Sequence, residues 1–190
     1  MPSEQLSLFT SAQAPRGRSP QAELQISAEV LQNWKARIVH YQRQVELTPV
    51  PTQGVLFDLA APAPLLDVHS LDPFTLPQHN SEFWRWKSAD VGTAALYFVI
   101  DYEHRLLLYV GETGRSGQRW QGEHDCKRYL LNYQQVHYRC GLSSQLGIAF
   151  CLAAPPQRQA RQQLEAVLID KWRSPFNKEN WDLWGTPFSR

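Results

Sequence analysis

Apolar residues along the chain first form a regular pattern in residues 27–45. Ser27 is a typical helix-capping residue, and the apolar positions after it recur at spacings of three and four. These positions are Val30, Leu31, Trp34, Ile38 and Tyr41. The pattern predicts one helix over residues 27–45 with a single apolar stripe, and we expect this stripe to pack on the main domain.

A denser pattern begins at residue 94 and predicts a compact domain of helices and strands. Residues 95–100 and 106–110 are apolar throughout and flank a short turn, which predicts a β-hairpin, and residues 146–152 predict a third strand. Helices are expected over residues 118–135 and over about 16 residues between Pro156 and Arg173. The predicted fold is α/β of the α+β kind: a small three-stranded, mostly antiparallel sheet flanked by helices, with an N-terminal helix and a Pro-rich extension.

The segments on either side of the first helix lack such patterns. Residues 10–26 are polar, small and Pro-containing, so we expect residues 1–26 to form a disordered tail. Most of the 13 prolines precede residue 91, which excludes long regular elements there and predicts an extended arm over residues 46–90. The main domain is then expected over residues 91–190.

Composition places this domain in a reducing compartment. No apolar run is long enough for a membrane-spanning helix, and the first nine residues lack the pattern of a secretory signal. The three cysteines have irregular spacing, so we expect a cytoplasmic protein without a disulfide framework. Together with His124 and His137, Cys126 and Cys140 do not have the usual zinc-ligand spacing. We interpret the cysteines as small apolar core residues.

Two short motifs in the predicted hairpin and three later residues form an ordered set. Residues 95–97 read Ala-Leu-Tyr and, after eleven intervening residues, residues 109–111 read Tyr-Val-Gly. Arg119 lies eight residues after the second motif, Glu165 lies in the last long predicted helix, and Asn177 follows twelve residues later. The set resembles the GIY-YIG endonuclease family over roughly residues 94–180. The Trp- and Pro-rich leader is similar to that of cyanobacterial members.

The resemblance implies a nuclease fold that hydrolyses DNA phosphodiester bonds with one divalent ion, Mg²⁺ or Mn²⁺. It implies Glu165 as the metal ligand, and a carboxylate on a rigid helix suits such an ion. Arg119 would bind the phosphate with two hydrogen bonds, a geometry that Lys lacks. Asn177 would orient water or brace the site. Gly111 would be a binding residue, because glycine lets the backbone approach the substrate closely.

The general base stays open at this point. Tyr97 would act as the base or through a proton network with Tyr109, but an ordinary tyrosine pKa of about 10 requires a nearby cation to lower it. The family commonly has His or Tyr four residues after the Arg, and this chain has Glu123 there, followed by His124. The candidates are therefore Tyr97, His124 and Glu123. Ala95 stands where the family usually has Gly, a small change that we expect to be tolerated.

The N-terminal peptide Gln5-Leu6-Ser7-Leu8-Phe9 resembles the pentapeptide by which bacterial DNA polymerases and repair proteins dock on the sliding clamp. All five positions agree with that consensus, so the resemblance implies the clamp as a partner. The Gln amide would hydrogen-bond at the edge of a pocket that Leu8 and Phe9 fill, and the tail would raise the effective concentration at DNA. This partner points to DNA repair, recombination or replication-linked processing.

The formal net charge of +1 is an average over two unlike halves. Residues 1–90 carry 7 basic and 9 acidic residues, and residues 91–190 carry 12 basic and 9 acidic residues, so the halves sum to −2 and +3. Even +3 is modest for a DNA-binding domain, and we expect weak, salt-sensitive binding that clamp delivery would assist. Two alternatives remain: a catalytically silent DNA-binding and clamp adaptor, and a nuclease of the restriction or homing type.

Overall fold

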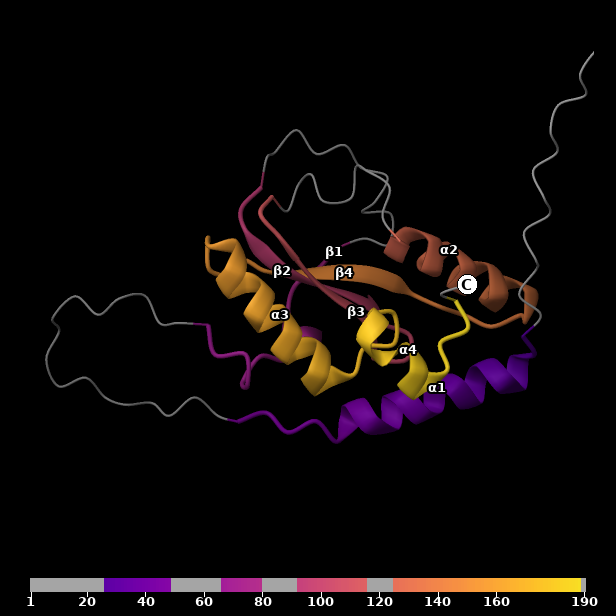
Figure 1. Ribbon diagram of the computed structural model, residues 1–190. Coiled ribbons are helices and arrows are strands. Elements are labelled where there is room, and N and C mark those ends of the chain that lie inside the picture. The colour runs from indigo at the N-terminus through magenta and orange to yellow at the C-terminus, as the bar shows by residue number, and fades with distance from the viewer. Residues whose placement is uncertain (1–25, 49–65, 80–91, 116–124, 189–190) are drawn as a thin grey trace, which may run out of the picture.

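The computed structural model describes residues 26–48, 66–79, 92–115 and 125–188 (Figure 1). In chain order the elements are α1 (Ala28–Arg43), the 3₁₀ helix η1 (Pro73–Thr75), β1 (Gln78–His79), β2 (Ala95–Asp101), β3 (Leu106–Thr113), α2 (Asp125–Arg139), β4 (Leu146–Cys151), α3 (Arg158–Trp172), the 3₁₀ helix η2 (Lys178–Asn180) and α4 (Trp181–Trp184). The pentapeptide at residues 5–9 and much of the predicted arm lie outside these ranges. Within them, no helix is both long and apolar enough to cross a membrane.

The strands form one antiparallel sheet in the order β1-β4-β2-β3. This confirms an α+β chain with an antiparallel sheet and corrects the predicted number of strands from three to four. The additional strand, β1, lies in the predicted arm and pairs Gln78 with Ala149 and His79 with Ile148. Both β1 residues are exposed, so this strand carries no apolar pattern that would reveal it in the sequence.

Helices cover both faces of the sheet (Figure 1). Residues of α1, α2 and the C-terminal segment pack on one face, around Tyr97 and Val99. Residues of α3 pack on the other face, around Phe98 and Val110. All seven residues of β2 are buried because its side chains alternate between these two cores, which explains why the strand is apolar throughout.

The helices follow the predicted pattern with one difference in extent. Ser27 caps α1, since its Oγ accepts a hydrogen bond from the Val30 N–H at 3.3 Å. The prediction for α2 began at residue 118, outside the described ranges, and ended at 135. The described helix continues to residue 139 because Val136 and His137 are buried and extend the packed face beyond a polar stretch.

β3 lies at the edge of the sheet, and two side-chain amides occupy its outer backbone groups. Gln42 of α1 accepts a hydrogen bond from the Leu107 N–H and donates one to the Leu107 carbonyl, each at 2.9 Å. Asn177 makes the same two bonds with Val110, also at 2.9 Å. An open edge strand is a template for unwanted pairing, and these amides satisfy it without an added strand. They also tie α1 and the C-terminal segment to β3.

Candidate active site

Tyr97 of β2 and Tyr109 of β3 lie together on the face of the sheet that α1 and α2 cover. The strand register pairs Tyr97 with Gly111 and Val99 with Tyr109, so the two tyrosines are diagonal neighbours. A β-bulge after the Val99–Tyr109 pair leaves Leu108 without a partner in the register, and Leu108 packs in the same core as the two tyrosines. The ring centroids are 5.9 Å apart at an interplanar angle of 27°. The hairpin therefore holds both rings in one stack.

Gly111 is a glycine because the Tyr97 ring occupies the space above it. A Cβ at residue 111 would lie 2.7 Å from Cε1 of Tyr97 and closer still to Cζ and the hydroxyl oxygen. A side chain at residue 111 would therefore displace the Tyr97 ring, so Gly111 helps to position the tyrosine. Close approach of the substrate to Gly111 stays a prediction.

The hydroxyl of Tyr109 is held in its protonated form. Burial raises the pKa of Tyr109 well above its ordinary value, and the neighbouring Tyr97, Cys126 and Glu165 raise it further. A side-chain hydrogen bond with Tyr97 acts in the same direction. Near neutral pH, Tyr109 is therefore a hydrogen-bond donor, close enough to Glu165 for the carboxylate charge to affect it.

The segment after α3 fixes the backbone on both sides of Tyr109. Phe176 donates its N–H to the carbonyl of the residue before Tyr109 at 2.9 Å, and Asn177 bonds to the backbone of Val110. The Asn177 Oδ1 also accepts a hydrogen bond from the Ser174 hydroxyl at 2.6 Å, and its side chain is buried. The sequence leaves two roles open for Asn177, orienting water or bracing the site, and these contacts favour bracing.

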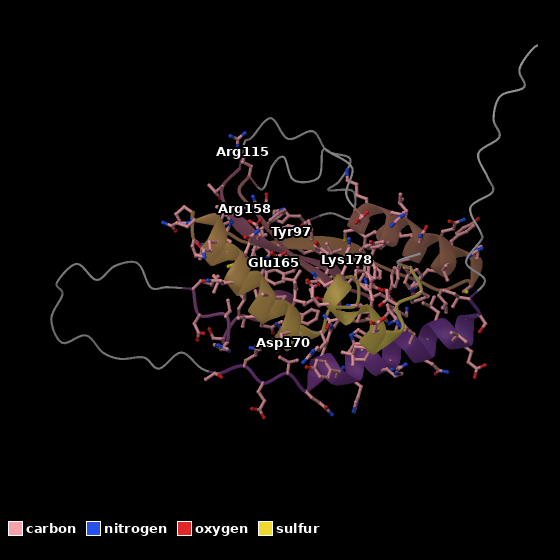
Figure 2. All side chains as sticks on the ribbon, in the orientation of Figure 1. Tyr97, Arg115, Arg158, Glu165, Asp170 and Lys178 are labelled. Atoms are coloured by element: carbon pink, nitrogen blue, oxygen red, sulfur yellow. The ribbon has the colours of Figure 1, made fainter. Side chains whose placement is uncertain are left out.

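Glu165 and Tyr109 line one groove of about 1580 Å³ between α2 and α3, and Asn177 contributes to its wall. Glu165 is partly buried on α3. In Figure 2 Glu165 is labelled at α3, and Lys178 is labelled between α3 and α2. Tyr97 is fully buried, so it reaches this groove through Tyr109.

A buried ion pair anchors the beginning of α3 one turn before Glu165. The Arg161 Nε lies 2.9 Å from Oε2 of Glu112 on β3, and its Nη1 donates to the carbonyls of Pro155 at 3.0 Å and Pro156 at 2.6 Å. The pair fixes α3 against β3 and thereby sets where Glu165 stands. Sequence reasoning missed it, although Glu112 follows the apolar β3 run on the face of Val110, where a carboxylate needs a cationic partner.

No protein-family model, curated protein or solved structure matches this chain. The family resemblance therefore rests on the ordered motif residues themselves. Of these, Tyr109, Glu165 and Asn177 line one groove, with Tyr97 and Gly111 directly behind Tyr109. Arg119, Glu123 and His124 fall in residues 116–124, outside the described ranges.

The groove offers one carboxylate beside the tyrosine pair as a metal ligand. Within the described ranges, no three His, Cys, Asp or Glu side chains are grouped to hold a metal ion. Mg²⁺ and Mn²⁺ prefer oxygen ligands, and Mg²⁺ is often bound through one or two carboxylates together with waters and substrate phosphates. Glu165 fits an ion of this kind that is bound jointly with a phosphate.

Of the candidate zinc ligands, His137, Cys126 and Cys140 lie in the described ranges and His124 lies outside them. His137 Nδ1 bonds to the Tyr133 carbonyl at 2.8 Å, and Nε2 bonds to Lys35 Nζ at 2.9 Å. Cys126 and Cys151 are buried, as predicted, and Cys140 is partly buried. These contacts give His137 a structural role between α1 and α2.

Charged side chains of both signs surround the Glu165 groove. Among the residues that the structure describes, four cations and four carboxylates line it: Lys127, Arg128, Arg173, Lys178, Asp125, Glu165, Asp170 and Glu179. Sequence analysis singled out only Glu165 among them, because the others come from two helices and a 3₁₀ turn that meet in the fold. Only Lys178 could have been suspected from the sequence, because it directly follows the motif residue Asn177.

Proposed function

We propose that this protein is a metal-dependent DNA endonuclease of the GIY-YIG type, with a nuclease domain fold of that family. The observation that carries the proposal is that Tyr109 and Glu165 line one groove, with Tyr97 stacked behind Tyr109. A hydroxyl donor and a metal-binding carboxylate in one cleft are groups that phosphodiester hydrolysis uses. The cysteine usage and the N-terminal peptide support a cytoplasmic role in repair, recombination or replication-linked processing.

The chain would bind and orient DNA with five residues. Glu165 would hold one Mg²⁺ or Mn²⁺ ion together with a DNA phosphate, and such an ion supplies charge stabilisation and a more acidic water. Tyr109 is kept protonated by burial and by a hydrogen bond with Tyr97, and it would donate to an oxygen in the groove by exchanging this bond. Asn177 holds the β3 backbone in place. Arg119, by resemblance, binds the phosphate.

Deprotonation of the attacking water requires a base, and protonated Tyr109 does not supply it. Tyr97, Glu123 and His124 remain the candidates. Single-turnover rates of Glu123→Gln and His124→Asn across pH identify the base, because its loss removes the acidic limb of the pH–rate profile. A limb that is unchanged in both variants excludes Glu123 and His124 as the base.

The test of the nuclease proposal is cleavage of plain, flapped and branched duplex DNA in Mg²⁺. We expect wild type to cleave at least one of these substrates and Glu165→Ala to cleave none at a measurable rate. Glu29→Gln, an exposed carboxylate in the first turn of α1, is the matched control and should cleave like wild type. No cleavage by wild type, or equal cleavage by Glu165→Ala, contradicts the proposal. Binding to these DNAs without cleavage indicates the silent adaptor.

Clamp recruitment has a separate test on the N-terminal peptide. Binding to the bacterial sliding clamp is expected to vanish when Leu8→Ala and Phe9→Ala are combined, since both side chains would fill the apolar pocket. Cleavage of short linear DNA, which needs no clamp, should be unchanged in the same variant. Clamp affinity equal to that of wild type removes the clamp from the proposed function.

A further inference from the structure

Three charged side chains meet on the α2 side of the Glu165 groove. Asp125, in the first turn of α2, lies 3.4 Å from Lys178 Nζ and 3.9 Å from Arg128 Nη2. The side chains of Asp125, Lys178 and Arg128 are 59%, 66% and 53% exposed, so a ligand in the groove can reach them. All three residues line the groove that also contains Glu165.

Each of the two cations rests against an aromatic ring. The Arg128 guanidinium lies 5.4 Å from the Tyr129 ring centre, and Lys178 Nζ lies 5.9 Å from the Trp181 ring centre. The two rings pack edge to face with centroids 5.7 Å apart. Cation–π contacts of this kind favour one position for each charge. Two cations from different elements are thus held on either side of the Asp125 carboxylate.

We propose that Arg128 and Lys178 bind one phosphate of the DNA backbone and that Asp125 occupies this pair when DNA is not bound. Guanidinium and ammonium groups donate equally well to carboxylate and phosphate oxygens, so a phosphate can replace the carboxylate. The proposal rests on the proposed function, because it assigns the pair to the same substrate in the same groove.

A DNA phosphate must replace the Asp125 carboxylate before it can bind Arg128 and Lys178. An exposed ion pair is weak, so a DNA phosphate that is also held elsewhere in the groove displaces the carboxylate. A phosphate without such support gains little, because it must compete with a charge that is already in place. Asp125 adds a negative charge beside the two cations, so it reduces the general attraction of this part of the groove for DNA.

The salt dependence of DNA binding tests the two cations. Affinity for a fluorescein-labelled duplex is measured by anisotropy in EDTA, between about 50 and 200 mM salt, so that cleavage does not interfere. Lys178→Gln and Arg128→Gln should each weaken binding and reduce the slope of log affinity against log salt, by about one when the two substitutions are combined. Arg43→Gln removes an exposed cation of α1 outside this groove and should leave the slope unchanged.

Substitution of Asp125 should strengthen DNA binding, whereas substitution of the two cations should weaken it. Asp125→Asn should bind the duplex about two- to fivefold more tightly than wild type at low salt, because one weak competing ion pair is removed. Glu29→Gln removes the same charge from the first turn of α1 and should show less than this gain. Misfolding cannot raise affinity, so the gain is a clean signal. In the Arg128→Gln, Lys178→Gln background, Asp125→Asn should give no gain at all.

The outcomes separate this proposal from the nuclease proposal. Slopes for Lys178→Gln and Arg128→Gln equal to that of Arg43→Gln, or Asp125→Asn binding no more tightly than Glu29→Gln, overturn the phosphate site. If cleavage nevertheless depends on Glu165, the nuclease proposal stands alone. If the binding results hold and wild type cleaves no DNA, the phosphate site stands and the nuclease proposal fails.

Discussion

Two tyrosine–carboxylate pairs in this molecule differ in their access to solvent. The Tyr133 hydroxyl of α2 donates to Oδ2 of Asp101 at 2.7 Å, and both residues are fully buried. Tyr109 lies close to Glu165, but this pair lines a groove of about 1580 Å³. Burial raises the pKa of both tyrosines well above the ordinary value, so a shifted pKa alone does not distinguish them.

The closed pair has the contacts of a structural element. The Asp101 Oδ1 accepts hydrogen bonds from the backbone N–H groups of Glu103 at 3.2 Å and Gln145 at 2.9 Å, in addition to the Tyr133 bond on Oδ2. These bonds join the β2–β3 turn, β4 and α2. A substrate has no path to Asp101, whereas it can reach Glu165. The comparison teaches that access, and not the perturbed tyrosine, marks the candidate active site.

The largest expected effect on stability comes from removing the closed carboxylate. Asp101→Ala leaves the buried Tyr133 hydroxyl and two partly buried N–H groups without an acceptor, which should lower the free energy of unfolding by about 3 kcal/mol. Urea unfolding measures this change, and Glu165→Ala is the matched comparison, with an expected loss below about 1 kcal/mol. Equal losses in the two variants would mean that the distinction between the pairs is wrong.

The open pair can be disturbed through Gly111. Gly111→Ala drives a methyl group into the Tyr97 ring, so we expect a loss of about 1–3 kcal/mol in unfolding free energy and slower DNA cleavage by the folded protein. Gly114→Ala is the control, because its Cβ would meet Arg161 Nη2 at an ordinary 3.5 Å. Normal stability of Gly111→Ala would contradict the assigned position of the Tyr97 ring.

Gln42 and Asn177 both bind the edge of β3, but only Asn177 binds beside Tyr109. Comparing the two therefore separates an effect on stability from an effect on the site. Gln42→Ala and Asn177→Ala each leave a buried N–H and carbonyl unpaired, and each should reduce the unfolding free energy by about 1–3 kcal/mol. Only Asn177→Ala should also slow cleavage, because Asn177 holds the residue beside Tyr109. The measurement is the cleavage rate per folded molecule of each variant. An equally slow rate in Gln42→Ala would show that Asn177 has no special role at the site.

The smallest expected effect is the pH response of the closed region. Burial lowers the pKa of His137 from its ordinary 6.5, with Lys35 and His104 acting in the same direction against Tyr133 and Asp101. The unfolded chain therefore binds the proton more readily, and the stability from His137 is present above about pH 6.5 and lost as pH falls, by at most about 1.4 kcal/mol per pH unit. Urea unfolding from pH 7 to 5 should show a shallower loss for His137→Gln. Parallel curves would exclude His137 as the cause.

The elements of the fold were predictable where local patterns decide them. Residues 95–101 and 106–113 form strands because their apolar runs are buried on both faces, and Ser27 begins α1 because its hydroxyl caps it. β1 was not predictable, since Gln78 and His79 are exposed and form a strand only through pairing with β4. The amide bonds of Gln42 and Asn177 were equally inaccessible, because each joins residues more than 60 positions apart.

The candidate site shows the same limit. The hairpin and the ordered motif predicted Tyr97, Tyr109 and Glu165 as a group, and the strand register explains how the two rings meet. The contact of the Tyr97 ring with Gly111 was not predictable, because it depends on the pairing of β2 with β3. Asp125 and Lys178 come from segments more than 50 residues apart, and their contact exists only in the fold.

The most direct test of the central claim compares the two carboxylates in one measurement. The single-turnover rate of DNA cleavage in Mg²⁺ is determined for Glu165→Gln and Asp101→Asn, each at a temperature where circular dichroism shows a folded protein. We predict that Glu165→Gln lowers the rate by about a thousandfold, as expected for loss of a metal ligand. We predict that Asp101→Asn stays within about threefold of wild type. A wild-type rate in Glu165→Gln would contradict the assignment of the open groove as the active site.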